Sequence, residues 1–225
     1  MIDHTEPRPR TDAFTAVDDF RWPVAGVWDT PVFDPKGVSS SFDHVATTRE
    51  CIRTLNPAML ADVMSLIRYV FAYKDADAGQ QHKRVMSAGA IHPIYPIILP
   101  KQYANEQPIL YQADRDIFVE LVISDASKIQ EGDLDVRTIL PDADAHAVLL
   151  AGDKARVDAH YLNTETLLLR DTGVALQMLA LTASACGLGL CPLGILGIDS
   201  LKGVLGDQER IVPLGMFVVG LPRSA

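Results

Sequence analysis

Residues 86–93 read MSAGAIHP, and they separate a polar, basic stretch at residues 80–84 from the apolar run IYPIIL. Ser87, Ala88 and Gly89 are small residues where a chain entering a strand usually carries branched or aromatic side chains. Small side chains let the backbone approach a flat or bulky group. A tight turn into a strand accounts for the same residues equally well, so the rest of the chain has to decide between a turn and a ligand contact.

The composition indicates a globular domain without a basic surface. The chain has 225 residues, 48% of them hydrophobic, and a formal net charge of −9. This length and hydrophobic content suffice for a sizeable core. The negative charge argues against a general nucleic-acid-binding protein, which needs a basic face, but it allows a local basic pocket for one phosphate.

The three cysteines predict a reducing environment. Cys51, Cys186 and Cys191 form an odd set with no CxxC pair and no accompanying histidine pattern. A disulfide framework and a structural zinc site are therefore both unexpected, and a cytoplasmic location is the default.

The N-terminal part differs in character from the rest. It is acidic and rich in proline, unlike a cationic signal peptide. Because proline interrupts regular structure, we expect residues 1–40 to form a loosely structured arm and residues 41–225 to form a single domain. The prolines of the arm are Pro7, Pro9, Pro23, Pro31 and Pro35.

The segment from Thr172 to Ile198 contains no charged residue and is long enough to span a bilayer. Its second half contains four helix-breaking residues, Gly187, Gly189, Pro192 and Gly194. A membrane helix does not tolerate such a cluster in mid-span. A buried core helix, or a helix at a dimer interface, is therefore the favoured interpretation.

Periodicity and turn residues predict helices at 55–71, about 163–186 and 198–206, and strands at 94–99, 107–115, 146–152 and 211–220. Asn56 is expected to cap the first helix, with Pro57 in its first turn. Pro96 indicates that its strand lies at an edge or is irregular, and Gly187 is expected to end the long helix. The irregular alternation predicts an α+β layer fold whose long central helix is buried.

Common nucleotide-binding and hydrolase motifs are absent. GLGLCPLG at residues 187–194 begins like a dinucleotide-binding fingerprint, but Pro192 stands where the third glycine is needed and a helix precedes the motif. The sequence contains no P-loop, no GxSxG elbow and no HExxH pattern. P-loop enzymes, hydrolases of the elbow type and metalloproteases are therefore not expected.

Four motifs in order resemble those of the flavin-dependent nitroreductase superfamily. They are RxCxRxL at residues 49–55, SAGAIHP at 87–93, LLLRDTG through CPLG at 167–194, and VVG at 218–220. The similarity covers residues 45–221 and is closest to the SagB-type branch, the azoline dehydrogenases and related oxidase domains of peptide synthetases. It implies a nitroreductase-like, three-layer α+β sandwich that forms a homodimer with FMN at the subunit interface.

The resemblance assigns FMN contacts to separate segments. Ser87, Ala88 and Gly89 would lie against the isoalloxazine ring, and Arg49 would pair with the phosphate. Arg53 would favour negative charge at the N1/O2 edge of the reduced ring.

Further implied contacts surround these residues. Glu50 and Cys51 belong to the first segment, and Cys51 replaces the usual serine, so a hydroxyl donor to the phosphate or ribityl chain is lost. The remaining implied contacts are Pro192, Leu193 and Gly194 on the N5 edge of the ring and Arg223 on the phosphate.

His160 and Tyr161 fall near the place of a Lys-Tyr pair that azoline dehydrogenases carry upstream of the long helix. The resemblance thus implies Tyr161 and His160 as catalytic residues. Histidine replaces lysine here, and an imidazole can act as a base near neutral pH. A surface imidazole at a helix start explains His160 about equally well.

The function implied by the resemblance is an FMN-dependent oxidase that aromatises a thiazoline or oxazoline, or desaturates a related peptide-derived substrate. The substrate would be a peptide or a small molecule on a carrier protein. A biosynthetic enzyme complex is a further implied partner, whereas nucleic acids and membranes are not expected as partners. One alternative is a reductase that passes electrons from NAD(P)H to a nitroaromatic, quinone or enone. Another is a member without turnover that binds flavin or a partner enzyme.

Overall fold

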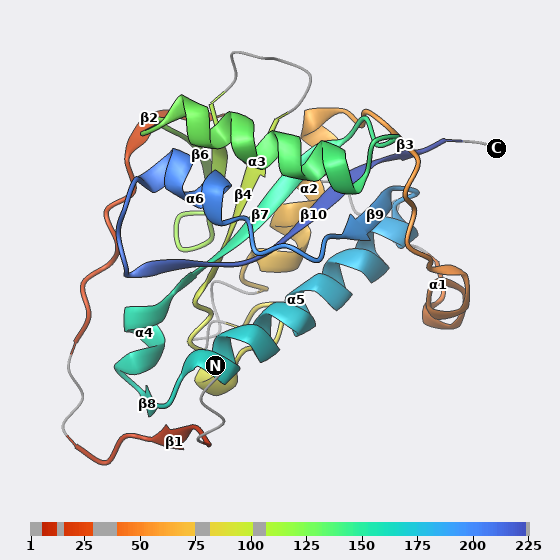
Figure 1. Ribbon diagram of the computed structural model, residues 1–225. Helices are drawn as coiled ribbons and strands as arrows, with labels where there is room; N and C mark the ends of the chain where they lie inside the picture. The colour runs from red at the N-terminus through yellow and green to blue at the C-terminus, as the bar shows by residue number, and fades with distance from the viewer. Residues whose placement is uncertain (1–5, 13–15, 29–39, 75–81, 101–106, 224–225) are drawn as a thin grey trace.

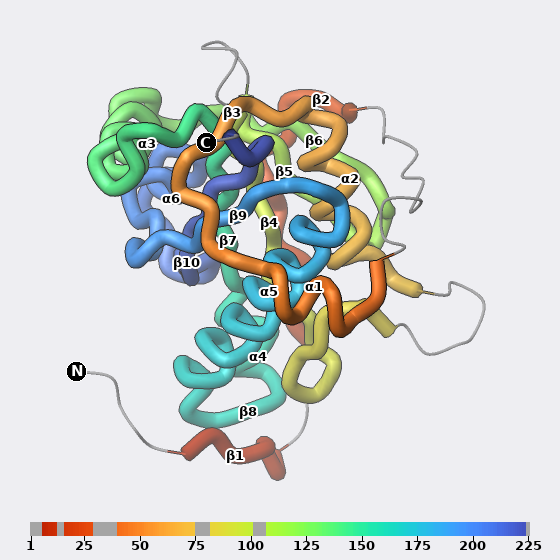
Figure 2. The backbone as a smooth tube through the Cα atoms, turned by 90° about the vertical axis from the view of Figure 1, so that its right-hand side faces the viewer, coloured from red at the N-terminus to blue at the C-terminus, as the bar shows by residue number. Residues whose placement is uncertain are grey.

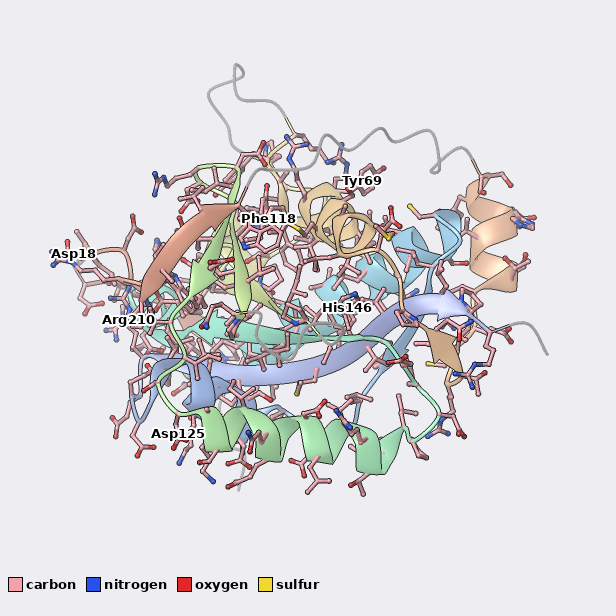
Figure 3. All side chains as sticks on the ribbon, turned by 90° about the horizontal axis from the view of Figure 1, so that it is seen from above. Asp18, Tyr69, Phe118, Asp125, His146 and Arg210 are labelled. Carbon is pink, nitrogen blue, oxygen red and sulfur yellow. The ribbon has the colours of Figure 1, made fainter. Side chains whose placement is uncertain are left out.

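A central sheet lies between two pairs of helices in the computed structural model, which describes residues 6–12, 16–28, 40–74, 82–100 and 107–223 (Figure 1). Helices α2 (Leu60–Phe71) and α5 (Glu165–Ala185) cover one face of the sheet. Helices α3 (Ala126–Ile139) and α6 (Ile198–Leu205) cover the other. Figure 3 shows this arrangement from above, with the sheet between α3 and α2. The shorter helices are α1 (Phe42–Thr48), α4 (Lys154–Asp158) and the 3-10 turn η2 (Ala88–Ala90).

The main sheet has eight strands within the described residues, and its neighbouring strands are antiparallel. Its path runs β2-β6-β5-β4-β7-β10-β3, and β9 pairs with β10 beside this path. The strands are β2 (Val24–Trp28), β3 (Leu55–Asn56), β4 (Ile94–Leu99), β5 (Ile109–Gln112), β6 (Ile117–Leu121), β7 (His146–Asp153), β9 (Gly189–Pro192) and β10 (Ile211–Pro222). A small second sheet joins β1 (Arg8–Pro9) to β8 (Tyr161–Leu162).

Both faces of the sheet are packed, because successive side chains of a strand point to opposite faces. In β4, Ile98 lies in the core under α2 and α5, whereas Ile97 lies in the core under α3 and α6. Phe217 and Val218 of β10 divide in the same way. Strands covered on both faces read as nearly continuous apolar runs, which explains why β4, β7 and β10 were recognisable in the sequence.

Most of the predicted elements are confirmed, including the strands that became β4, β7 and β10 and the long helix α5. Gly187 ends α5 with a φ of 74°, and its N–H donates to the Ser184 carbonyl at 3.1 Å. The predicted start of the first helix is wrong. Asn56 pairs with Leu221 in the sheet, so it does not cap a helix, and α2 begins only at Leu60.

The prediction from Pro96 is confirmed in part: β4 is not an edge strand, because it lies between β5 and β7, but its pairing is irregular at the proline. Its pairing with β5 begins at Ile97, whereas Pro96 is paired with Leu150 of β7. The proline therefore occupies a stretch of β4 that has a partner on one side only, where a missing N–H donor is tolerated.

Part of the expected N-terminal arm has regular structure. Val24–Trp28 form β2, which pairs with β6, and the Trp28 indole donates to the Glu120 carboxylate at 2.6 Å. Five residues between Pro23 and Pro31 suffice for a strand at the edge of a sheet. The expected arm also includes residues 1–5, 13–15 and 29–39, which lie outside the described residues.

Helix α5 is buried on one face only. Leu168, Ala175 and Leu179 are buried against the sheet. On the other face, Leu169 is 42% exposed, and a Cβ added to Gly173 would meet no atom within 4 Å. The predicted central helix is therefore half covered in one chain. None of the helices in the described part of the chain is long and apolar enough to cross a membrane.

Candidate functional site

Ser87, Ala88 and Gly89, called here the SAG loop, are held by Asp171 of α5. The Ser87 hydroxyl donates to Asp171 Oδ2 at 2.6 Å, and the Ala88 N–H donates to the same carboxylate at 3.2 Å. Ser87 Oγ also accepts the His92 N–H at 3.0 Å. Because Asp171 is buried, these charge-assisted hydrogen bonds are shielded from water and fix the loop on the helix.

The SAG loop has a strained backbone. Gly89, Ala90 and His92 have φ values of 60°, 54° and 51°. Such left-handed conformations cost a residue with a Cβ about 1–3 kcal/mol and concentrate at functional sites. A Cβ on Gly89 would also lie 2.9 Å from the hydroxyl oxygen of Tyr161. Glycine is thus required by the backbone, and the group that approaches it within this chain is a tyrosine.

The two predicted catalytic residues lie beside the SAG loop. Tyr161 contacts Gly89, and His160 lines an open hollow of about 280 Å³. The His160 Nδ1 atom lies 3.0 Å from the Arg156 carbonyl, an arrangement that requires an N–H at Nδ1. In the neutral imidazole the lone pair is then on Nε2, the atom that can accept a proton. The hollow is also lined by Val17, Asp19, Gly89, Ala90, Ile91, Arg156 and Ala159.

The other predicted contacts gather beyond the C-terminal end of α5. Residues 49–54, called here the arginine segment, contact β9 where the Ile52 N–H donates to the Leu190 carbonyl at 3.4 Å. The Arg223 N–H donates to the Thr54 carbonyl at 3.2 Å. The predicted phosphate and ring-edge contacts therefore lie together at this end of the molecule. They are Arg49, Glu50, Cys51 and Arg53 of the arginine segment, Arg223, and Pro192, Leu193 and Gly194 at the end of β9 and just after it.

Helix α5 separates the two groups within one chain. The SAG loop is attached at Asp171, whereas the arginine segment lies beside β9, which follows the end of the helix at Ala185. With a rise of 1.5 Å per residue, Asp171 and Ala185 are about 20 Å apart. Figure 2 shows the same separation, with β8 at one end of the molecule and β3 and the C-terminus at the other.

A small pocket lined mostly by apolar residues adjoins the SAG loop at Ser87, and the sequence analysis missed it. Lys83 and His92 line it together with Ser87. Lys83 is 9% exposed, its ammonium lies 4.6 Å from the centre of the Tyr73 ring, and burial lowers its pKa to about 8. Burial also lowers the pKa of His92 to about 4, and His92 Nδ1 has no hydrogen-bond partner among the described residues. In the sequence Lys83 belongs to a basic stretch that reads as solvent-exposed.

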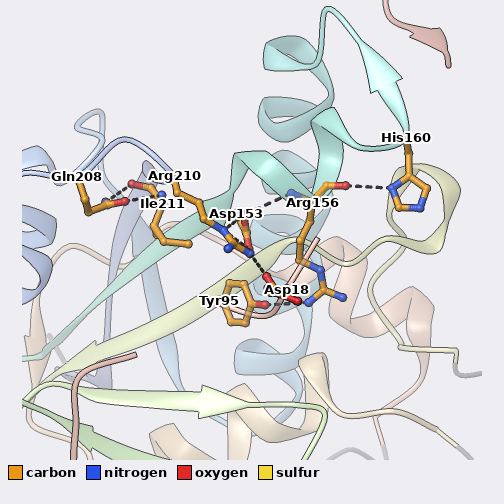
Figure 4. A network of polar contacts seen from close by, with 8 residues as sticks. All are labelled: Asp18, Tyr95, Asp153, Arg156, His160, Gln208, Arg210 and Ile211. Carbon is orange, nitrogen blue, oxygen red and sulfur yellow. Dashed lines mark hydrogen bonds and ion pairs between the residues drawn. The ribbon is translucent and has the colours of Figure 1, made fainter. Parts of the chain in front are cut away.

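An ion pair between Asp153 and Arg210 positions α4. Asp153 is fully buried and receives three hydrogen bonds from Arg210, the shortest at 2.7 Å (Figure 4). Its carboxylate also accepts the Arg156 N–H at 3.3 Å and so caps α4. Arg156 in turn donates to the Tyr95 hydroxyl at 2.8 Å and carries the carbonyl that orients His160. The network thus connects the sheet to the predicted base.

Comparison with known proteins identifies the architecture. No protein-family model matches this chain, and no curated protein sequence matches it. Among solved structures, a protein from Ralstonia eutropha described as a nitroreductase matches with a TM-score of 0.67 at 13% identity, over 95% of this chain and 100% of its own. The chain has the nitroreductase fold.

Two further solved structures are similar to this chain. A protein from Desulfovibrio desulfuricans, described as a nitroreductase and solved in complex with FMN, matches 83% of this chain and 88% of its own, with a TM-score of 0.53 and 17% identity. A protein from Clostridium acetobutylicum described as an NADH oxidase matches 80% of this chain and 89% of its own, with a TM-score of 0.52 and 17% identity. At these identities the similarity is one of fold, and it confirms the predicted nitroreductase-like α+β architecture.

Asp171 is another residue of the site that sequence reasoning missed. It lies in the RDTG motif of the long helix, but the sequence offered it no partner. One signal was available, since a charged residue on the apolar side of a helix is rarely buried unless it is hydrogen-bonded. Ser87 and Ala88, 84 and 83 positions away, satisfy that need only in the folded chain.

Proposed function

We propose that this chain is an FMN-dependent oxidoreductase that works as a homodimer and accepts hydride from NADH or NADPH. The electrons would pass to an acceptor such as a nitroaromatic, a quinone or an enone. Similarity of fold to an FMN-bound protein and to one described as an NADH oxidase supports this proposal.

The observation that carries the proposal is that the residues predicted to contact FMN form two groups at opposite ends of α5. A second copy packed on the uncovered face of α5 would bring the arginine segment of one copy to the SAG loop of the other. This face suits such packing, because the helix is uncharged from Thr172 onward and Gly173 leaves room for a close approach. An interface of this kind would also cover Leu169, which is 42% exposed in one chain.

The residues at the two ends fit the two ends of FMN. Arg49 and Arg53 form no ion pair with a carboxylate of the described residues. The Arg223 Nε–H donates to a neutral amide oxygen, Asn56 Oδ1, at 3.2 Å, and no ion pair joins Arg223 to a carboxylate of the described residues. These guanidinium groups are available for a phosphate, which they can hold bidentately. At the other end Gly89 is exposed and has no side chain, so a planar ring can lie against its backbone.

Each group of residues has a separate task in this scheme. Arg49 and Arg223 would bind the phosphate, and Arg53 would stabilise negative charge at the edge of the ring. The SAG loop, held by Asp171, would present a rigid surface to the ring and exclude water from it. Bound FMN supplies the hydride-accepting atom N5. The chain orients the nucleotide and substrate so that hydride can move between them.

The double substitution Arg49→Ala, Arg53→Ala should weaken FMN binding by about 100-fold or more. Hydrogen bonds to charged groups contribute about 1.5–3 kcal/mol each, which is roughly 10- to 100-fold per arginine. Titration of the apoprotein with FMN, followed by flavin fluorescence, measures the affinity. Arg137→Ala is the matched control, because Arg137 is exposed and pairs with Asp133 on α3, in the opposite helix layer. Unchanged affinity in the double variant would contradict the phosphate assignment.

Mixing two defective chains should restore FMN binding if each site uses two copies. The Gly89→Val variant is expected to lose FMN, because a branched residue cannot adopt the φ of 60° required there. In a heterodimer with the Arg49→Ala, Arg53→Ala chain, one of the two sites has both native halves. Co-expression with two different tags and double affinity purification should give heterodimers with FMN at half of their sites. Heterodimers without FMN would show that one chain supplies the whole site.

A second candidate function, oxidation of an azoline in a peptide or on a carrier protein, is favoured by one specific observation. His160 lines the same hollow as Gly89, and Tyr161 touches the SAG loop, so a base and a phenol flank the proposed ring position. Anaerobic mixing with NADPH separates the two functions. Rapid bleaching of the flavin supports the reductase. If NADPH fails and a thiazoline peptide bleaches the flavin, with the rate lost in His160→Ala or Tyr161→Phe, the oxidase replaces it.

A further inference from the structure

Cys51 and Cys191 lie against each other where the arginine segment meets β9. The Cys51 thiol and the Arg53 guanidinium both lie close enough to the Cys191 thiol to act on its charge. The backbones of the two segments are joined beside them, where the Ile52 N–H donates to the Leu190 carbonyl. Two cysteines that are far apart in the sequence are therefore neighbours in the fold.

The separation of the two segments suits a covalent link. Chains joined by a backbone hydrogen bond lie about 5 Å apart. A disulfide spans Cα separations of about 4.4–6.8 Å, a range that two segments joined by a backbone hydrogen bond can reach. In addition, the Cys51 thiol is a near neighbour of the Cys191 thiol.

The two thiols differ in access. Cys51 is exposed, so a dissolved oxidant can reach it. Cys191 is 5% exposed within β9, and burial raises the pKa of its thiol, an effect that Arg53 opposes. These environments suit a first thiol that meets the oxidant and a second, protected thiol that resolves the product. Cys186 is half-buried at the end of α5 and has no cysteine partner among the described residues.

We propose that Cys51 and Cys191 form a reversible intramolecular disulfide when the protein meets hydrogen peroxide. The Cys51 thiolate attacks one peroxide oxygen; an S–O bond forms, the O–O bond breaks, and the leaving hydroxide takes up a proton to become water. Cys191 then attacks the sulfenic sulfur, so that the S–S bond forms and the S–O bond breaks. The second hydroxide leaves as water with the Cys191 proton. The peroxide is reduced by the two electrons that the thiols lose.

The disulfide would fasten the arginine segment to β9 and to the residues that follow it, Leu193 and Gly194. A thiol reductant reverses the bond and frees the segment. The proposal concerns the chain alone and does not depend on FMN, so its test can succeed or fail separately from the proposed function.

Thiol counting and peptide mapping of the purified full chain test the proposal. After treatment with a few equivalents of hydrogen peroxide, free thiols should fall from three to one, and the intact mass should drop by about 2 Da. Proteolysis under non-reducing conditions should yield one linked peptide that contains Cys51 and Cys191. Dithiothreitol should restore all three thiols.

Single substitutions provide the controls. Cys186→Ser should still form the linked peptide, whereas Cys51→Ser and Cys191→Ser should each abolish it. In Cys191→Ser the oxidised Cys51 lacks its resolving thiol, so a sulfenic acid should be trapped there by dimedone. Retention of three thiols, a Cys51–Cys51 link between two copies, or oxidation of Cys51 to a sulfinic acid without a link would each overturn the proposal.

Discussion

Replacement of Asp153 by alanine should lower the free energy of unfolding by about 3–5 kcal/mol, the usual cost of removing one partner of a buried ion pair. The substitution leaves the Arg210 guanidinium, whose side chain is 28% exposed, without its carboxylate. It also removes the side-chain cap of α4, the helix that carries the Arg156 carbonyl behind His160. Urea denaturation followed by circular dichroism measures the loss.

Two comparisons show whether the ion pair itself is responsible. Asp133→Ala removes an exposed pair with Arg137 at 2.6 Å and should cost about 0.5 kcal/mol or less. The double variant Asp153→Ala, Arg210→Met removes both charges, so it should be more stable than Asp153→Ala alone. If Asp153→Ala proves no more harmful than Asp133→Ala, the buried pair is not a main support of this region.

Replacement of Lys83 by methionine should stabilise the protein by about 1–3 kcal/mol at pH 7, and the gain should vanish at high pH. Burial lowers the pKa of Lys83 from 10.5 to about 8, and the ring of Tyr73 compensates only part of that cost. Below pH 8 the lysine is charged in both the folded and the unfolded chain, so the folded state bears the full cost of the buried charge. Methionine keeps the apolar stem and removes the charge.

The pH dependence identifies the cause. Between pH 8 and 10.5 the unfolded chain holds more protons at Lys83 than the folded chain, so the unfolding free energy of the native protein rises with pH. The difference between Lys83→Met and the native protein should therefore shrink over this window, by about 3 kcal/mol at most. Lys202→Met, at a more exposed lysine, is the control and should show no such trend. A difference that stays constant from pH 7 to pH 11 would refute the prediction.

Local patterns predicted most of the fold because its inner strands are covered on both faces and its long helix is mostly apolar. The strands β4, β7 and β10 and the helix α5 are long apolar runs with turn residues at their ends, so their sequences identify them directly. Elements with mostly exposed side chains were missed. Helix α3 buries only Gly132 and Val136, and its clearest start signal is the Asp125 side chain, which accepts the Ser127 N–H at 2.9 Å.

The first predicted helix shows why local signals fail at boundaries. Asn56 followed by Pro57 is a common way to begin a helix, and nothing nearby in the sequence contradicts it. The backbone of Asn56 is instead paired with Leu221, a residue 165 positions later. Sheet pairing with a residue so far away in the sequence outweighs a capping preference of about 1 kcal/mol. No local sequence pattern reveals that pairing.

The amino-acid sequence by itself determined which residues are small, basic or apolar, and in what order their motifs follow. This was enough for the nitroreductase-like α+β fold, because hydrophobic periodicity and glycine positions act over a few residues. Only the tertiary structure decided which of these residues meet. It placed Asp171 under the SAG loop, Cys51 against Cys191, and the arginine segment at the far end of α5 from Gly89. The reason is physical: a buried carboxylate, a thiol pair and a guanidinium acquire their properties from neighbours that the packing of distant segments supplies.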